Sequence, residues 1–276
     1  MVGGALIARM RQAEAEVTGT TRRLGSPGEL LHLDLSTDLS SWRPPQPGGT
    51  AILCAGVTGV QACEDDPAGS RRVNVEGIVQ VAKNLHAAGV FVIYLSTNQV
   101  FDGSAPFRAP TDPTCPVTEY GRQKAEAERQ LTAAGTVGVI VRLTKVLGPR
   151  NSLFSGWTQS LRAGQGIQAY SDMTFAPVPL SCVVDVLLLL AARRLGGIFQ
   201  VSGEKDITYA TAAQIGAEAL GVEPRLVQSV KSAAARSVPI HTTLNVDSLK
   251  SATGVVPPAV RWTVETTFMQ PQLLGG

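Results

Sequence analysis

The fold is decided by the stretch Val90-Phe-Val-Ile-Tyr-Leu-Ser-Thr-Asn-Gln-Val-Phe-Asp-Gly103. It begins with an apolar run, which is followed by the two hydroxyl side chains of Ser96 and Thr97. Residues 90–95 are almost uninterrupted in their apolar character, which is typical of a strand covered on both faces, as in a parallel sheet. Ser96 and Thr97 therefore fall at the carboxyl end of that strand. Because ligands of open parallel sheets bind beyond those ends, the sequence predicts a binding site at this position.

A second motif, Tyr120-Gly-Arg-Gln-Lys124, begins a segment of residues 120–131 whose composition favours helix. Tyr120 and Lys124 are four residues apart, so their side chains project from one face of that helix. A cation beside a phenol lowers the pKa of the phenol from about 10 toward the working pH. Each residue alone has a simpler structural interpretation. Together with the upstream Ser-Thr pair, they predict an active site in which Tyr120 donates and accepts a proton.

The composition excludes several classes of protein. The 276 residues carry a net charge of +2 and no basic run longer than two residues, so an extended nucleic-acid interface is not expected. The four cysteines have no CxxC or metal-ligand spacing, which favours a reducing cytosol and predicts no metal site. The most apolar stretch, residues 182–192, is shorter than the roughly 20 residues that span a bilayer. With no secretory signal evident, we expect a cytoplasmic protein without a membrane segment.

Strand-like and helix-like segments alternate through the first half of the chain, which indicates βα units and a parallel sheet. Strands are expected at residues 16–21, 30–35, 50–55, 90–95, 136–143 and 197–201. Helices are expected at residues 4–13, 70–88, 120–131, 153–163, 182–195 and 209–220, with a Pro- and Gly-rich loop at 42–49. The predicted fold is an α/β, Rossmann-like doubly wound parallel sheet over residues 1–150. Residues 151–276 are expected to form a smaller lobe interleaved with the last sheet elements.

The start of the chain departs from this fold. A dinucleotide-binding fold opens with a strand, a glycine-rich turn and a helix whose N-terminus receives the pyrophosphate. Met1-Val-Gly-Gly-Ala-Leu-Ile7 reads like the end of such a turn, with Gly3 as its third glycine and with the first strand and two glycines missing. That strand is central in the order 3-2-1-4-5-6. Its loss therefore predicts a gap with unpaired backbone groups in the middle of the sheet.

Two explanations of this start are open. The protein begins roughly 10 residues earlier, about one strand and a turn upstream, or the chain is naturally short and either compensates for the loss or has lost its activity. The glycines Gly3 and Gly4 also have a simpler interpretation, as helix-start glycines that bind no ligand.

The two motifs and their surroundings resemble a known superfamily. Residues 96–103, Ser-Thr-Asn-Gln-Val-Phe-Asp-Gly, are similar to the signature STDYVFDG and depart from it at Asn98 and Gln99. Residues 116–126 are similar to PxNxYGxSKxxGE, and the likeness continues through residues 141–148 and 244–257. The chain thus resembles the extended short-chain dehydrogenase/reductases, and within them the dTDP-4-dehydrorhamnose reductases and their RmlD-like, sugar-nucleotide-binding relatives.

The resemblance implies a hydride transfer between NADPH or NADH and the keto carbon of a nucleotide-linked sugar, in a reductase or an epimerase. Tyr120 would protonate the developing alkoxide, and Thr97 would hydrogen-bond the same oxygen. Lys124 would lower the pKa of the tyrosine and hold the nicotinamide ribose. The alternative is a non-catalytic, regulatory or sugar-nucleotide-binding subunit, which the incomplete phosphate turn and the altered Asn98 and Gln99 favour. The family commonly forms homodimers.

The resemblance also implies a set of cofactor residues. Arg22 and Arg23 follow the strand at 16–21, where an arginine suits the 2′-phosphate of NADP, so NADPH is expected; a solvated loop is the alternative. Asp34 and Leu35 would lie by the adenine. The loop at 55–57 would pass the phosphates and ribose, with its glycine allowing close approach, while Asn74 would be structural. The expected cofactor residues are Gly3, Arg22, Arg23, Asp34, Leu35, Ala55, Gly56, Val57, Ser96, Tyr120 and Lys124.

The substrate is expected to contact Thr97, Gln99, Val100 and Arg150. A nucleotide diphosphate would suit the cations Arg150, Arg162, Lys145 and Arg261, since arginine grips phosphate in bidentate fashion; ordinary surface charges are the alternative. Residues 175–179, Phe-Ala-Pro-Val-Pro, replace a polar loop that faces substrate in the family. That departure counts against dTDP-4-dehydrorhamnose itself as the substrate.

Overall fold

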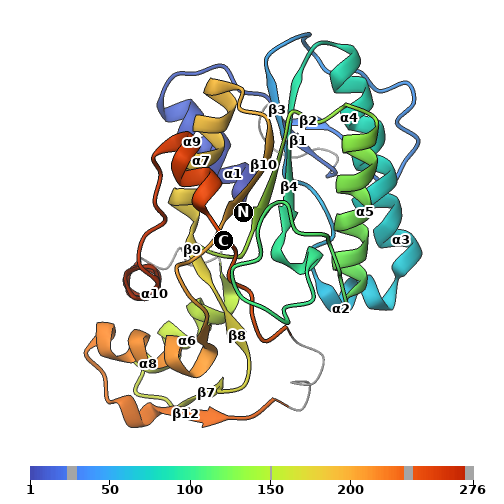
Figure 1. Cartoon of the computed structure of the whole chain (residues 1–276). Coiled ribbons are helices and arrows are strands. Elements are labelled where there is room, and N and C mark those ends of the chain that lie inside the picture. The colour runs from blue at the N-terminus through green and yellow to red at the C-terminus, as the bar shows by residue number, and fades with distance from the viewer. Residues whose placement is uncertain (24–29, 150, 233–238, 271–276) are drawn as a thin grey trace. The chain divides into compact units, whose positions relative to one another are not determined.

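The computed structural model describes residues 1–23, 30–149, 151–232 and 239–270 (Figure 1). The chain divides into two compact units, each built from three stretches. Unit 1 consists of Met1–Phe101, Pro113–Arg142 and Val186–Phe199, and unit 2 of Asp102–Asp112, Leu143–Asp185 and Gln200–Gly276. The two units are interleaved along the chain, because residues 186–199 return to unit 1 between two stretches of unit 2.

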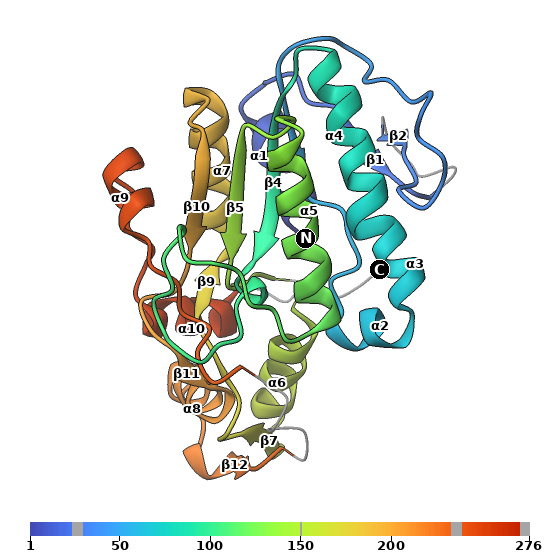
Figure 2. The ribbon, with the colours of Figure 1, turned by 45° about the vertical axis from the view of Figure 1, so that its right-hand side comes forward.

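The main sheet has four strands in the order β10-β5-β4-β3. They are β3 (Thr50–Leu53), β4 (Phe91–Thr97), β5 (Val139–Leu143) and β10 (Gly197–Val201). Strands β3 and β4 are parallel, with Thr50 opposite Phe91, and the arrows of β4, β5 and β10 point the same way in Figure 2. Every residue of β5, and every residue of β4 after Phe91, is buried. The sheet covered on both faces that the apolar run predicts is therefore confirmed.

A second, two-stranded sheet pairs β1 (Gly19–Thr21) with β2 (Leu30–His32) in parallel, with Gly19 opposite Leu30. In the described residues no strand pairs with both β1 and β3, so the two sheets are separate. Residues of β3 are half-buried or exposed, in contrast to those of β4. The predicted gap in the order 3-2-1-4-5-6 therefore lies between β1 and β3, where the central first strand of the full fold would pair.

One side of the main sheet is covered by a long helical run and by α5 (Glu119–Ala133). The run follows the short helix α2 (Val60–Asp65) and consists of α3 (Pro67–Arg71), the π-helical segment η1 (Arg72–Gly77) and α4 (Ile78–Ala87). Its buried apolar side chains recur at helical spacing. They pack with β4 and α5 in one cluster that includes Ile78, Val79, Ala82, Leu85, Val92, Tyr94, Ala127 and Leu131.

On the other side of the sheet lie α1 (Val2–Gln12) and the part of α7 (Leu180–Arg193) that belongs to unit 1 (Figures 1 and 2). Helices on both faces of a parallel sheet make unit 1 a doubly wound α/β layer, as predicted. No helix in the described part of the chain combines the length and the apolarity needed to cross a membrane.

Unit 2 contains three two-stranded pairings and four helices of its own among the described residues. The pairs are β6 (Lys145–Leu147) with β9 (Pro177–Pro179), β7 (Ile167–Tyr170) with β12 (Val227–Val230), and β8 (Thr174–Phe175) with β11 (Ile207–Thr208). The helices are α6 (Ser152–Arg162), α8 (Tyr209–Leu220), α9 (Asp247–Thr253) and α10 (Val260–Met269). The 3-10 turns are η2 (Asn98–Val100), in unit 1, and η3 (Pro224–Leu226).

The core of unit 2 is aromatic. The ring of Phe154 meets those of Trp157, Phe175 and Phe268 edge to face, with centroids 5.4, 6.0 and 5.6 Å apart. Residues 175–179 stand where the similar family has a polar loop that faces substrate. They are buried, because Phe175 fills this core and β9 pairs with β6. The helices α2, α9 and α10 are further elements that the periodicity did not predict.

Candidate active site

Two hydroxyl side chains end β4 inside unit 1, and both Ser96 and Thr97 are buried. Thr97 caps the turn η2, and its Oγ1 accepts a hydrogen bond from the amide of Gln99 at 3.3 Å. Among the described residues, none hydrogen-bonds the buried Oγ of Ser96. A buried hydroxyl without a partner is uncommon and costly, so this atom is suited to a polar group of a ligand.

Tyr120 lies in the first turn of α5, where Thr118 caps the helix by accepting a hydrogen bond from the amide of Gly121 at 3.0 Å. Burial raises the pKa of Tyr120 to about 12, although a hydrogen bond with the side chain of Thr97 acts to lower it. The structure thus brings Thr97 and Tyr120 together. The lowered pKa predicted for the phenol is not found, because desolvation outweighs the other influences on it.

Lys124 lies one turn after Tyr120 on α5, and its side chain is buried. Its Nζ donates to the carbonyl oxygen of Leu95 at 2.5 Å and lies 4.1 Å from the centre of the Tyr94 ring. Burial lowers the pKa of Lys124 to about 8, against the opposing effect of the Glu128 carboxylate. The ammonium therefore binds the end of β4, and the group loses its charge as the pH rises through about 8.

An ion pair that the sequence did not reveal supports this part of α5. Arg142 of β5 donates to Glu128 at 2.7 Å, and both side chains are almost completely buried. The guanidinium carbon of Arg142 also lies 5.0 Å from the ring centre of Phe101. The sequence indicates only one half of this ion pair, because Glu128 lies four residues after Lys124 on the same helix. Its partner comes from a strand, which spacing cannot identify.

The loop after β3 carries three of the predicted cofactor residues. Ala55 and Gly56 are exposed, and Val57 is half-buried. A Cβ at Gly56 would lie 2.9 Å from Oδ1 of Asn74, so a glycine is required for this close approach. The same Oδ1 accepts from the amide of Val57 at 2.8 Å. Asn74, predicted as structural, thus holds the loop in place.

The predicted adenosine residues gather at the carboxyl ends of β1 and β2. Hydrogen bonds from Ser36 lower the pKa of Asp34, and the nearby positive charge of Arg22 adds to this effect. Arg22 and Arg23 are exposed. Leu35 is buried and helps to line a cavity of about 380 Å³, together with Ser36, Thr37, Asp38, Leu39, Arg72, Glu76, Gly77 and Gln80.

Gly3 lies inside the first turn of α1 rather than in a turn before it. A Cβ at this position would lie 3.5 Å from the Cβ of Cys54, which is ordinary van der Waals contact. The start of α1 therefore approaches the end of β3, where backbone N–H groups of a helix favour an anion. The tight turn and the two further glycines of the fingerprint have no counterpart among the described residues.

The predicted substrate residues are only partly brought together. Gln99 accepts a hydrogen bond from the hydroxyl of Thr118 at 3.1 Å, and Val100 is fully buried. Arg150 lies outside the described residues. Of the cations expected near a diphosphate, Lys145 and Arg162 are exposed in unit 2, whereas Arg261 is paired with Glu218 at 2.8 Å and Glu265 at 2.7 Å.

Comparisons with known proteins agree with the motifs. A family model described as the RmlD substrate binding domain matches residues 1–272. The dTDP-4-dehydrorhamnose reductase of Burkholderia thailandensis is 31% identical over 237 residues, covering 77% of this chain and 78% of that protein. A probable low-salt glycan biosynthesis reductase of Haloferax volcanii is 28% identical over 221 residues, covering 76% of this chain and 73% of that protein.

Solved structures show the same fold. The dTDP-4-dehydrorhamnose reductase of Bacillus anthracis in complex with NADP has a TM-score of 0.84 at 19% identity, covering 97% of this chain and 95% of that one. The UDP-glucose 4-epimerase of Thermus thermophilus in complex with NAD has a TM-score of 0.78 at 21% identity, covering 98% and 96%. Because the family model spans almost the whole sequence and a relative exceeds 30% identity over three quarters of it, the chain belongs to the RmlD substrate-binding-domain family.

Proposed function

We propose that this chain is an NADPH-dependent reductase that acts on the keto group of a nucleotide-linked sugar. The observation that carries the proposal is the meeting of Thr97 and Tyr120 at the end of β4, with the buried Lys124 one turn along the same helix. Relatives named as dTDP-4-dehydrorhamnose reductases, and the neighbour solved with NADP, support this class of reaction.

Tyr120 is the proposed proton donor. With a pKa of about 12 its phenol keeps its proton at neutral pH, and an alkoxide is more basic still, so proton transfer to the keto oxygen is favourable. NADPH, when bound, supplies the hydride. Thr97 orients the phenol and stabilises the charge that develops on the same oxygen.

Lys124 and Ser96 are proposed to position the cofactor. The ammonium of Lys124 fixes the end of β4 through the carbonyl of Leu95, and we assign it to the nicotinamide ribose. The buried Oγ of Ser96, which finds no partner among the described residues, is a second polar atom suited to the same ligand.

The remaining cofactor contacts follow the chain from α1 to the loop after β3. The start of α1 at Gly3 is assigned to the pyrophosphate, and the exposed Arg22 and Arg23 to the 2′-phosphate. The loop at 55–57 is assigned to the neighbouring ribose and phosphate.

A second candidate is a non-catalytic, sugar-nucleotide-binding or regulatory protein of the same fold. The departures from the family signature at Asn98 and Gln99, which follow Thr97 directly, favour it.

A titration and an assay separate the two candidates. Purified chain is titrated with NADPH while the fluorescence of the nicotinamide is followed, and NADPH oxidation is then measured with dTDP-4-dehydrorhamnose and with a UDP-linked 4-keto sugar. Binding together with turnover of either sugar supports the reductase. NADPH binding or sugar-nucleotide binding without turnover of either supports the second candidate, and absence of both kinds of binding contradicts both.

A further inference from the structure

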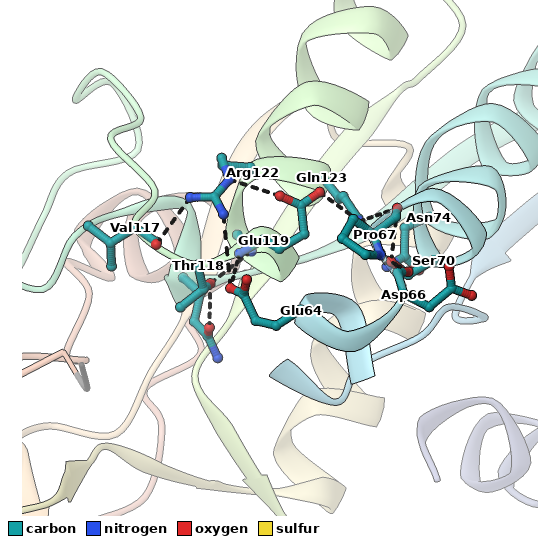
Figure 3. Close-up of polar contacts among 12 residues, drawn as sticks. Glu64, Asp66, Pro67, Ser70, Asn74, Val117, Thr118, Glu119, Arg122 and Gln123 are labelled. Carbon is teal, nitrogen blue, oxygen red and sulfur yellow. Dashed lines mark hydrogen bonds and ion pairs between the residues drawn. The ribbon is translucent and has the colours of Figure 1, made fainter. Parts of the chain in front are cut away.

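The side chain of Gln123 is buried and has partners at both ends of its amide (Figure 3). Its Oε1 accepts a hydrogen bond from Nδ2 of Asn74 at 2.9 Å. Its Nε2 donates to Oγ of Ser70 at 2.8 Å and to Oε1 of Glu119 at 2.9 Å, with the carbonyl of Pro67 at 3.2 Å. An amide carries two donor hydrogens, so this group is fully satisfied. Its loss would leave several buried polar atoms without partners.

Asn74, which bonds to Gln123, also bonds to the proposed cofactor loop at residues 55–57. Its Oδ1 accepts from the amide of Val57 at 2.8 Å, and its Nδ2 donates to the carbonyl of Val57 at 2.9 Å. One side chain therefore holds both main-chain groups of the same loop residue. Asn74 lies in η1, and such π-helical segments occur frequently at functional sites.

The other end of the contact is the first turn of α5 (Figure 3). Glu119, which accepts from Gln123, begins this helix, and its amide donates to Oε1 of Glu64 at 2.8 Å. Tyr120 comes three residues before Gln123 and Lys124 directly after it. The turn that carries the proposed proton donor is thus joined to the proposed cofactor loop through two amide side chains.

We propose that Gln123 is a positioning residue that couples the cofactor loop at Val57 to the first turn of the catalytic helix. The proposal rests on the proposed function and deepens it. Binding of NADPH at the loop and placement of Tyr120 then depend on one hydrogen bond, between Asn74 and Gln123. The similar reductase motif PxNxYGxSKxxGE has serine here, whose side chain is shorter and carries its donor and acceptor on one oxygen atom. In this chain the longer glutamine presents them on two separate atoms, Oε1 toward Asn74 and Nε2 toward Ser70 and Glu119.

The coupling is tested with Gln123→Met, which keeps the length of the side chain and removes its polar atoms. Gln130→Met is the matched control, because Gln130 lies on the same helix and its side chain bonds only to Glu126 among the described residues. We expect Gln123→Met to weaken NADPH binding about tenfold and to lower kcat about tenfold, as the loss of a buried hydrogen bond predicts. The control should change neither quantity.

A reciprocal exchange provides a second variant. Gln123→Glu alone places a carboxylate opposite Glu119 and should impair the chain at least as strongly. The double variant Glu119→Gln with Gln123→Glu restores a donor opposite an acceptor and keeps an acceptor for Asn74. We expect it to recover most of the NADPH affinity and kcat. Rescue by the swap supports the coupling. Because a carboxylate at position 123 also loses the donor to the carbonyl of Pro67, the results that can contradict the coupling are those of Gln123→Met and of the Val57 amide exchange.

A third readout needs no cofactor. Hydrogen exchange of the Val57 amide, which Asn74 holds, should become faster in Gln123→Met and stay unchanged in Gln130→Met. A lowered Tm with unchanged NADPH affinity, kcat and Val57 exchange would assign Gln123 a structural role only and overturn the proposal. If the wild-type chain binds no NADPH, the proposed function fails, and the exchange of Val57 still decides whether Gln123 holds the loop.

Discussion

The Nζ of Lys124 donates a hydrogen bond of 2.5 Å to the carbonyl oxygen of Leu95, so helix α5 is held against the strand that ends in Thr97. The same ammonium lies over the ring of Tyr94. It is therefore a buried cation held by a backbone dipole and an aromatic face. Such a charge is stabilised less well than in water, which is why its pKa falls to about 8.

This burial gives the stability of the protein a pH dependence. The ordinary pKa of Lys124, 10.5, applies to the unfolded chain, and its pKa in the folded chain is about 8. Between these values the unfolded chain binds the proton and the folded chain does not. The contribution of this site to stability therefore rises with pH over that window and is lost as the pH falls through about 8.

Replacing Lys124 by Met should remove that slope. In urea unfolding, the stability of the wild type relative to Lys124→Met should rise by about 3 kcal/mol from pH 8 to pH 10.5. The exposed Lys83 of α4, changed to Met, is the matched control. Parallel curves for wild type and Lys124→Met would contradict the burial of a charge at this position.

Tyr120→Phe should abolish the proton transfer and leave the packing intact. We expect kcat to fall by about 100-fold or more, with the affinity for NADPH changed by less than about twofold, because only one hydroxyl is removed. Tyr170→Phe, at an exposed tyrosine of unit 2, is the control and should retain full activity. Full turnover by Tyr120→Phe would show that another group supplies the proton.

Gly121 allows the start of α5 to lie against the turn after β4. A Cβ at this position would overlap the carbonyl oxygen of Gln99, so Gly121→Ala should destabilise the protein by about 1–3 kcal/mol and displace Tyr120. Gly156 of α6 has open space around its Cα, and Gly156→Ala should stabilise by about 0.5–1 kcal/mol. Measurement of Tm for the two variants, with opposite signs expected, checks the contact.

The Glu128–Arg142 pair is buried, so removing one charge leaves the other without compensation. Glu128→Gln should cost about 3–5 kcal/mol in unfolding experiments. The comparison is Glu126→Gln on the same helix. Glu126 forms an ion pair of 2.8 Å with Arg129, whose side chain is exposed. There the loss should be below about 1 kcal/mol. Equal effects of the two substitutions would be inconsistent with the buried pair.

Arg22 should decide the choice between the two nicotinamide cofactors. Arg22→Ala removes a cation suited to the 2′-phosphate, so the KM for NADPH should rise about tenfold while the KM for NADH stays within about twofold. Steady-state kinetics with both cofactors measure the ratio. An equal rise in the KM for NADH would show that Arg22 contacts a part common to both cofactors, or supports the backbone, rather than binding the 2′-phosphate.

The sequence predicted those parts of the site whose signal is local. An apolar run ending in hydroxyls identified β4, and the bounds expected for the alanine-rich helix, 209–220, agree with α8. The spacing of Tyr120 and Lys124 placed both on α5. These features depend on neighbouring residues only, as strand burial and helix periodicity do.

Contacts between distant residues could not be predicted in this way. The bond between Asn74 and Gln123 joins two helices 49 residues apart, and the raised pKa of Tyr120 reflects how deeply the fold buries it. Strand β9 (Pro177–Pro179) was not predicted, because proline disfavours strand interiors. The burial of residues 175–179 follows from the aromatic core around Phe154, which is assembled from several elements.

The break between β1 and β3 has a consequence for how this protein can change. The β1–β2 sheet has only three residue pairs in register and no hydrogen-bonded neighbour among the described strands. A ribbon of this size adds little to global stability, so substitutions around Arg22 carry little risk for the main sheet. Substitutions in the exposed residues that follow β1 can therefore accumulate without loss of the sheet that supports Tyr120.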